Sequence, residues 1–285
     1  MMADAWYVDE QTNVMTGQAA EEAIRARSDA AFLSEEGIVR VSQERWETAQ
    51  RFERTGWMEK WAGASDDRNL LHAEEYEGYA ALAGQRIGHA MELGCGPFTN
   101  LRVIADFVEI GKVSLLDPLM ESYRQLPNCR YGRGTAAGLR AHSGDPVLPI
   151  VEMFACPIEN MTAEGRKYDL VVMMNVIEHC FDVEAIFSKI LAMTSPGSAF
   201  IFHDSMYDPE KTRQVVKGKY YEAGHPLMVG YPVMEQFMRE HFETLFFRTA
   251  PNAPDYLEVC PHSGHFYFIG RRKQQAASRA EPVQR

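Results

Sequence analysis

The sequence has no long hydrophobic run, few cysteines and no excess of positive charge. Its longest apolar stretches, such as residues 170–174 and 199–202, have the length of a strand, far below the roughly 20 residues that a membrane-spanning helix needs. The first 15 residues contain three acidic side chains and lack the apolar core of a secretory signal. We therefore expect a protein that neither spans a membrane nor is secreted.

Cysteine usage is typical of a reducing compartment. The 285 residues include only five cysteines, an odd number, and no two of them form a C-x-x-C pair. A disulfide framework requires paired cysteines and an oxidising environment. The sequence therefore predicts reduced, mostly buried thiols in a cytoplasmic protein.

Positive charge is scarce as well. Lys and Arg number 29 against 40 Asp and Glu, which gives a net charge of −11. Phosphate backbones are bound by clustered Lys and Arg, so this composition argues against a nucleic-acid partner. The balance varies along the chain: residues 1–88 carry 9 basic and 17 acidic side chains, whereas residues 271–285 carry 5 basic and 1 acidic.

The spacing of hydrophobic residues divides the chain into two parts. Aromatic residues at helical spacing predict a helix over 42–61, with Ser42 as its cap, and further helices are expected at 18–32 and 70–82. The stretch 62–69 between them is expected to be a loop. No internal repeat is visible.

From residue 87 onward, predicted strands alternate with predicted helices, and residues 127–149 are rich in Gly, Pro and Arg and are expected to form a loop. This alternation favours a parallel sheet with helices on both faces. The predicted strands are 87–93, 112–116, 151–155, 168–174, 199–203, 244–249 and 264–270. Such sheets bind ligands beyond the carboxyl ends of their strands, so the residues after each strand are the functional candidates.

The first two strands end in a pattern typical of nucleoside binding. Residues 92–97, Glu-Leu-Gly-Cys-Gly-Pro, follow the first strand, and the glycines let the backbone turn tightly and approach a ligand. Asp117 ends the second strand, where an acid commonly accepts hydrogen bonds from ribose hydroxyls. An ordinary strand–helix turn is the alternative interpretation. A dinucleotide fingerprint is not completed, because Thr99 stands where its third glycine belongs.

Residues 92–97 resemble motif I of the class I S-adenosylmethionine (SAM)-dependent methyltransferases, and the resemblance extends over about residues 87–270. It implies an α/β, Rossmann-like class I methyltransferase fold, with a seven-stranded, mostly parallel sheet, helices on both faces and an N-terminal helical cap. The implied organisation is a cap or lid at 1–85, a SAM-binding catalytic domain at 86–272 containing an acceptor-recognition insertion at 207–233, and a flexible tail at 273–285.

The resemblance also implies how the cofactor is held. Glu92 would support the amino group of SAM, and Asp117 would hold both ribose hydroxyls. The backbone N–H of Ile158 would reach the adenine ring, with Glu159 replacing the usual acid at the exocyclic amine. The implied cofactor-binding residues are Glu92, Gly94, Cys95, Gly96, Asp117, Pro118, Ile158, Glu159 and Asn175.

Two acid–histidine pairs at the carboxyl edge are candidates for the chemistry. His203 and Asp204 follow the fifth strand of the motif order, and they would suit a general base for a hydroxyl acceptor. The alternative is that His203 is a strand residue whose polar atoms are satisfied by neighbouring backbone. The catalytic candidates are His179, His203, Asp204 and His225.

Glu178 and His179 follow the fourth strand and are similar to a metal-binding segment. Certain ubiquinone-pathway O-methyltransferases and small-RNA 2′-O-methyltransferases carry Glu-x-x-Glu-His here and a later His, and these bind a divalent metal. In this chain Asn175 replaces the first Glu, and His225 stands at the later His. The similarity implies a metal such as Mg²⁺ at Glu178, His179 and His225; a metal-free pair that shapes the pocket is the alternative.

Together these features predict a SAM-dependent methyltransferase of EC 2.1.1 type that acts in small-molecule biosynthesis by O-methylation of a small-molecule or sugar-containing acceptor. An N-methyltransferase, a non-catalytic SAM-binding partner subunit and a NAD-dependent oxidoreductase are the alternatives. Basic residues in 207–233 suggest an anionic or polyhydroxylated acceptor, with a solvated charged loop as the alternative, and a homodimer is compatible with the sequence. The tryptophans of 42–61 are either core contacts or part of a lid over the active site.

Overall fold

The computed structural model describes most of the proposed catalytic domain. The described residues are 6–8, 14–16, 33–34, 37–65, 67–132, 138–208, 224–251 and 262–274. The predicted helix at 18–32 and the final residues 275–285 lie outside them, as does 209–223 within the predicted insertion.

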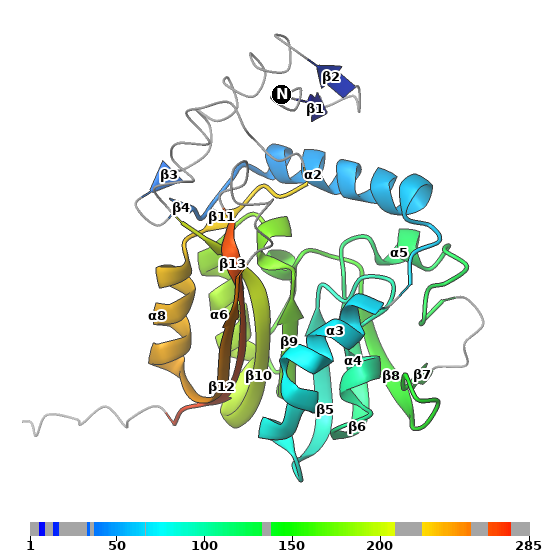
Figure 1. Ribbon diagram of the computed structural model, residues 1–285, viewed down its shortest axis with the longest axis vertical. Coiled ribbons are helices and arrows are strands. Elements are labelled where there is room, and N and C mark those ends of the chain that lie inside the picture. Colours follow the sequence, from blue (N-terminus) through cyan, green and yellow to red (C-terminus); the bar gives the residue numbers. More distant parts are fainter. Residues whose placement is uncertain are drawn as a thin grey trace, which may run out of the picture.

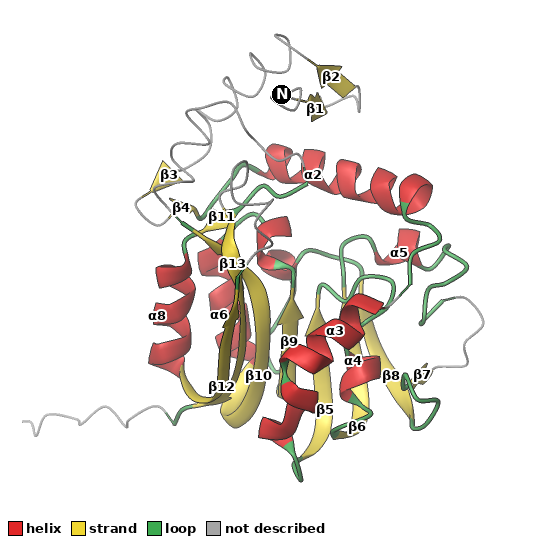
Figure 2. Cartoon of the chain, in the orientation of Figure 1, coloured by secondary structure: helices red, strands yellow, loops and turns green. Residues whose placement is uncertain are grey.

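The body of the molecule is an eight-stranded sheet (Figures 1 and 2). Its strands are β5 (Arg86–Leu93), β6 (Glu109–Leu116), β7 (Gly138–Arg140), β8 (Val147–Phe154), β9 (Tyr168–Met174), β10 (Thr194–Tyr207), β12 (Phe242–Ala250) and β13 (His262–Arg272). They lie in the order β12-β13-β10-β9-β5-β6-β8-β7. Strands β10, β9, β5, β6 and β8 are parallel, and β13 is antiparallel to both of its neighbours.

This arrangement confirms the predicted α/β, Rossmann-like fold, and each of the seven predicted strands is present. The eighth strand is β7, a short strand that pairs antiparallel with β8 at the sheet edge. It lies in 127–149, which was expected to be a loop, because three residues rich in Gly and Arg give too short a pattern to recognise.

Helices cover both faces of the sheet, as Figure 1 shows. The helices are α2 (Gln43–Thr55), α3 (Asp67–Glu75), α4 (Leu101–Ile104), α5 (Met120–Tyr123), α6 (Val183–Met193) and α8 (Tyr231–His241). Shorter helical turns are η1 (Gly56–Lys60), η2 (Glu77–Leu82), η3 (Ile158–Asn160) and η4 (Ile177–His179). None of the described helices combines the length and apolar character needed to cross a membrane.

Alternation along the buried strands creates two hydrophobic cores. In β9, Val171 and Met173 face the core beneath α6 and α8, while Leu170, Val172 and Met174 face the core beneath α3 and α4. All five side chains are buried, so β9 is apolar on both faces. Two covered faces are what hold this strand, and the loop that follows it, in the centre of the sheet.

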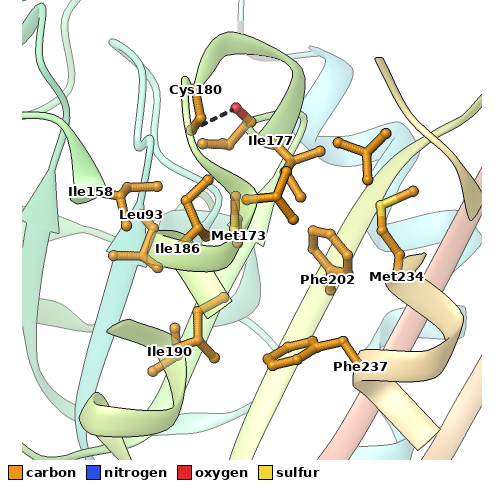
Figure 3. Close-up of a cluster of buried hydrophobic side chains, with 14 of the residues drawn as sticks. Leu93, Ile158, Met173, Ile177, Cys180, Ile186, Ile190, Phe202, Met234 and Phe237 are labelled. Atoms are coloured by element: carbon orange, nitrogen blue, oxygen red, sulfur yellow. Dashed lines mark hydrogen bonds between the residues drawn. The ribbon is translucent and has the colours of Figure 1, made fainter. Parts of the chain in front are cut away.

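The core beneath α6 and α8 supports the loops at the carboxyl edge. Figure 3 shows Ile186 and Ile190 of α6 beside Phe202 of β10 and Phe237 of α8. Burying each such side chain contributes about 1.5–3 kcal/mol to folding. Ile158, in the loop after β8, packs into the same core, so the position of that loop depends on the packing below it.

The helix predicted at 42–61 is present and lies across one end of the sheet in Figure 1. Its cap is as predicted: the Ser42 Oγ accepts a hydrogen bond of 3.1 Å from the Arg45 amide. After Thr55 the chain continues as the π-helical turn η1. The helical periodicity and the capping residue agree, so the sequence alone predicted where this helix begins.

The next helical prediction needs correction at both ends. Helix α3 begins at Asp67, inside the predicted loop 62–69. The predicted helix 70–82 is interrupted after Glu75, because Glu77, Gly78 and Tyr79 have φ angles of 53°, 63° and 53°, and these residues belong to the separate turn η2. Because α3 begins at Asp67, Arg68 and His72 both lie on this helix, at the edge of the sheet.

Small strands complete the described structure. Strands β1 (Trp6–Val8) and β2 (Val14–Thr16) pair antiparallel. Strands β11 (Met228–Val229), β4 (Gly37–Ile38) and β3 (Leu33–Ser34) form a three-stranded sheet. Next to β11, the Leu227 amide donates to the Glu178 carbonyl at 3.2 Å, which brings the segment containing His225 against the loop after β9.

Candidate active site

A cavity lies at the carboxyl ends of β5, β6, β8 and β9, with helices α2 and α3 on its other side. Its lining includes most of the predicted cofactor residues: Gly94, Cys95, Gly96, Asp117, Pro118, Ile158, Glu159 and Asn175. His179 also lines it. The structure therefore gathers residues from four separate loops at one edge, as expected for parallel strands.

The glycine turn after β5 has a conformation that only glycine tolerates well. Gly94 has a φ of 68°, and a Cβ there would lie 2.4 Å from the Val176 Cγ2. The amides of Gly94 and Cys95 both donate to the Leu116 carbonyl, at 2.8 and 3.0 Å. These bonds tie the turn to the end of β6 and bring it against the next loop.

Glu92 lies behind this turn and outside the cavity lining, rather than facing the space as the resemblance implied. Its carboxylate accepts hydrogen bonds from the amides of Asn100 and Leu101, at 2.8 and 3.2 Å, from the Asn100 Nδ2 and from the Thr99 hydroxyl. Burial raises the pKa of Glu92, and these donors oppose the shift. Glu92 therefore holds the turn and the start of α4 in place.

Asp117 lines the cavity at the end of β6. Its Oδ2 accepts from the Gly96 amide at 3.0 Å, and its Oδ1 accepts from the Leu119 amide at 2.8 Å. Burial raises its pKa to about 7 despite these two bonds. Each carboxylate oxygen can accept a second hydrogen bond, so the site fits a ligand that offers a pair of hydroxyl donors.

The loop after β8 offers one donor and one acceptor to the same cavity. The amide of Ile158 begins the turn η3 and has no hydrogen-bond partner among the described residues. The Glu159 Oε1 accepts from the amides of Phe181 and Asp182 at 2.7 and 3.2 Å, whereas its buried Oε2 is unpartnered. A planar ring with one acceptor and one amine would complement this pair.

Glu178, His179 and His225 form the cluster that the sequence predicted as a metal site. Their ligand atoms all lie within 4.8 Å of one another. The Glu178 Oε1 is 3.9 Å from the His179 Nε2 and 3.7 Å from the His225 Nε2. The Tyr207 hydroxyl donates to the Glu178 Oε2 at 2.9 Å, and the His179 Nδ1 lies 3.2 Å from the Gly224 carbonyl.

His203 and Asp204 are placed differently from the prediction. They are 2% and 0% exposed, and neither lines the cavity. The Asp204 Oδ2 accepts from the amides of Val176 and Ile177 at 3.2 and 3.0 Å. Burial, together with the nearby Glu178 charge, raises the pKa of Asp204 to about 8. This carboxyl therefore holds the loop after β9, and the pair lies behind the cavity wall.

Asn175 turns away from the cluster and toward α3. With its amide oriented to satisfy both neighbours, its Nδ2 donates to the His203 Nδ1, and its Oδ1 accepts from the Nε and Nη2 of Arg68, each at 2.9 Å. The backbone of Asn175 has a φ of 55°, a conformation that asparagine tolerates better than most residues. Asn175 thus connects Arg68 to the buried His203.

Helices α2 and α3 supply further lining residues, of which the sequence suggested only the tryptophans, as part of a lid. From α2 these are Trp46, Gln50 and Glu53, followed by Trp57 of η1, and from α3 they include Arg68, Asn69 and His72. The Nε1 of Trp46 and the Nε2 of Gln50 both donate to the His179 carbonyl, at 3.0 and 3.2 Å. Spacings of three and four residues are the signal of a common helix face, but they also suit an ordinary core.

The chain also matches a known protein family. A family model described as a methyltransferase domain matches residues 77–229, which is more than half of the chain. Comparison with curated proteins gives no match.

Solved structures share the fold at low sequence identity. The N-methyltransferase NodS from Bradyrhizobium japonicum WM9, in complex with S-adenosyl-L-homocysteine, is 13% identical with a TM-score of 0.53, and the match covers 81% of this chain and 99% of that chain. A structure described as a putative sarcosine dimethylglycine methyltransferase from Galdieria sulphuraria is 14% identical with a TM-score of 0.52, and the match covers 79% of this chain and 98% of that chain.

Proposed function

This chain belongs to the methyltransferase family whose domain model matches residues 77–229, and we propose that it transfers a methyl group from SAM to an oxygen of a small-molecule or sugar-containing acceptor. The observation that carries the proposal is the cavity at the carboxyl edge, where the glycine turn and Asp117 face the loop after β9. A nucleoside cofactor and an acceptor would both reach that space.

The hydrogen-bonding groups in the cavity fit SAM. Asp117 can accept from two ribose hydroxyls, and the Ile158 amide and the Glu159 Oε2 can serve the adenine ring. Glu92 contributes from behind, by fixing the glycine turn against which the methionine part would pack. When bound, SAM supplies an electrophilic methyl group on a cationic sulfonium. The protein's task is to align the acceptor with it, because positioning dominates in-line displacement.

An oxygen acceptor must also lose a proton, and we place that step at the histidine cluster. His179 lines the cavity, with His225 at a ring-centroid distance of 4.5 Å and Glu178 beside both. If the His179 Nδ1 donates to the Gly224 carbonyl, its Nε2 carries the lone pair that can accept a proton. The buried His203 and Asp204 then act as positioning residues for the loop.

As an alternative to the base role of His179, the same cluster fits a divalent metal. One carboxylate and two imidazoles within 4.8 Å of one another form a donor set that suits Mn²⁺ or Zn²⁺ better than Mg²⁺, which prefers oxygen ligands. A cation there would also offset the repulsion between Glu178 and Asp204. When bound, such a metal would supply Lewis-acid activation of an acceptor oxygen. Asn175 does not belong to the set, because its side chain binds Arg68 and His203.

We extend the proposal to the organisation of the chain. Residues 1–85 would act as a cap or lid, 86–272 as the catalytic domain, 207–233 as the acceptor-recognition insertion and 273–285 as a tail, in a cytoplasmic protein that can form a homodimer. Helix α2 supports the lid role, because it lines the cavity and binds the His179 carbonyl through Trp46 and Gln50. A lid of this kind excludes water during transfer.

Nitrogen is the alternative acceptor atom, and it is considered because the structurally similar NodS is described as an N-methyltransferase. A neutral amine attacks without prior loss of a proton, so it needs less help from a base. Replacing His179 or His225 by alanine would therefore reduce kcat for an oxygen acceptor far more than for an amine.

The test is a binding measurement followed by a turnover assay. Isothermal titration should show binding of S-adenosylhomocysteine, and methyl transfer should be measured over a panel of hydroxylated and amine acceptors. Binding without turnover on any acceptor would favour a non-catalytic partner subunit, and binding of NAD in place of SAM would refute the proposal. If the metal operates, EDTA abolishes turnover and Mn²⁺ or Zn²⁺ restores it, whereas EDTA-insensitive turnover excludes it.

A further inference from the structure

Arg68 lies in the first turn of α3 and lines the cavity at the edge of the sheet. Its guanidinium is held by Asn175, whose Oδ1 accepts from the Nε and Nη2 at 2.9 Å. A guanidinium carries five N–H donors. The two bonds to Asn175 fix its plane and leave three donors for a ligand.

No carboxylate neutralises Arg68 among the residues that the structure describes: the ion pairs there involve other arginines and histidines. His72 and His203 lie close enough to Arg68 for its charge to lower the pKa of each. His72, one helical turn away on α3, has a buried and unpartnered Nδ1, and the His72 ring lies 4.4 Å from that of His203. Burial, with a smaller contribution from Arg68, lowers the pKa of His72 to about 3, so the His72 ring is neutral near pH 7.

The cavity lining carries charged groups of both signs. Asp117, Glu159 and Glu53 supply acidic groups to the lining, which suits the hydroxyls, amines and sulfonium of SAM but not its carboxylate. Arg68 supplies a cationic group with unused donors to the same cavity, next to Asn175. A guanidinium edge matches the two oxygens of a carboxylate or phosphate and binds them in a bidentate manner.

We propose that Arg68 is the acceptor-recognition residue of this site and that the methyl acceptor carries an oxyanion, a carboxylate or a phosphate, which the Arg68 guanidinium binds. The inference rests on the proposed methyl transfer for the identity of the ligand as the acceptor. Asn175 acts as a positioning residue, because it orients the guanidinium and connects it to His203. Neutral His72 offers a hydrogen bond beside the anion without adding charge.

The experiment measures oxyanion binding by the full chain, with and without saturating S-adenosylhomocysteine. Benzoate, inorganic phosphate and neutral benzamide are titrated while the arginine Nε–Hε signals are followed by NMR. The variants are Arg68→Gln and Arg68→Lys, and the matched control is Arg86→Gln. Arg86 is an exposed arginine at the start of β5 that pairs with Glu109 at 2.9 Å.

We expect benzoate or phosphate, but not benzamide, to shift one arginine signal that Arg68→Gln removes. Losing hydrogen bonds to a charged group should weaken oxyanion binding by at least about tenfold in Arg68→Gln, less in Arg68→Lys, and not in Arg86→Gln. The stronger of the two anions identifies the group on the acceptor. Equal oxyanion binding by the wild type and Arg68→Gln, or no binding to the wild type, overturns the inference.

Binding of S-adenosylhomocysteine is read in the same samples and should be unchanged in all variants. Weaker product binding by Arg68→Gln, or loss of the oxyanion shift when the product saturates the protein, would assign Arg68 to the carboxylate of the cofactor and overturn the inference. If the cofactor product fails to bind while oxyanion binding still depends on Arg68, the proposed methyl transfer fails and the anion site remains. If the product binds and the oxyanions do not depend on Arg68, only the present inference fails.

Discussion

Acidification from pH 8 to pH 6 should weaken binding of S-adenosylhomocysteine, and Asp117 is the group that we expect to cause the change. Burial raises its pKa from 3.8 to about 7, although the Leu119 and Gly96 amides donate to it. Ribose hydroxyls bind the ionised carboxylate, so the complex favours the charged form. Protonation of Asp117 in the free protein therefore competes with the cofactor.

The size of the effect follows from that pKa. At pH 8 about nine in ten Asp117 side chains are ionised, and at pH 6 about one in ten, so affinity should fall roughly tenfold, or about 1.4 kcal/mol. Binding is complete above the raised pKa and is lost as the pH falls through it. The contribution of Asp117 to the stability of the ligand-free protein follows the opposite trend, since a raised carboxyl pKa means that folding favours the protonated form.

The assay is isothermal titration at pH 8, 7 and 6 with the wild type, Asp117→Asn and a control, Asp106→Asn. The Asp117→Asn variant should bind about 1.5–3 kcal/mol more weakly at pH 8 and show no pH dependence, because the titrating group is gone. Asp106 is exposed and binds Ser143, so its variant should follow the wild type. A wild-type affinity that does not change with pH, or an equal slope in Asp117→Asn, would refute the reasoning.

Three further substitutions test the scaffold of the site. Gly94→Ala places a Cβ 2.4 Å from the Val176 Cγ2 at a φ of 68°, so it should cost about 1–3 kcal/mol and weaken binding of S-adenosylhomocysteine; normal stability and affinity would contradict the turn geometry. Ile186→Ala empties a fully buried position and should lower the free energy of unfolding in urea by about 2–5 kcal/mol, while a loss below 1 kcal/mol would argue against the core as described. Ser42→Ala removes the hydrogen bond to the Arg45 amide and should cost about 1 kcal/mol, read as a lower Tm; an unchanged Tm would show that the cap contributes nothing.

Local patterns accounted for most of the scaffold. The seven strands were predicted correctly because each contains a stretch of apolar residues long enough to be recognised. Helix α2 was predicted because the spacing of its apolar residues and its capping residue agree. The errors occurred where local signals are weak. Strand β7 is three residues long, and the break after Glu75 depends on positive φ angles at Gly78 and Tyr79.

Parallel strands also made part of the site predictable. In such a sheet the carboxyl ends of all the strands share one edge, so Asp117 and the glycine turn could be expected to meet. The cluster of Glu178, His179 and His225 was predicted from a family resemblance, and the structure brings these three together. Whether His225 would reach the loop after β9 depended on β11 and on the bond from the Leu227 amide to the Glu178 carbonyl.

The sequence by itself therefore determined the alternation of strands and helices, the glycine turn and the acid that follows it, because these are properties of short segments. Only the tertiary structure decided which polar groups face the cavity. It placed Asp204 under the loop that it stabilises, and it brought Arg68 from α3 against Asn175, 107 residues further along the chain. Such contacts depend on the packing of elements far apart in the sequence, and no local spacing encodes them.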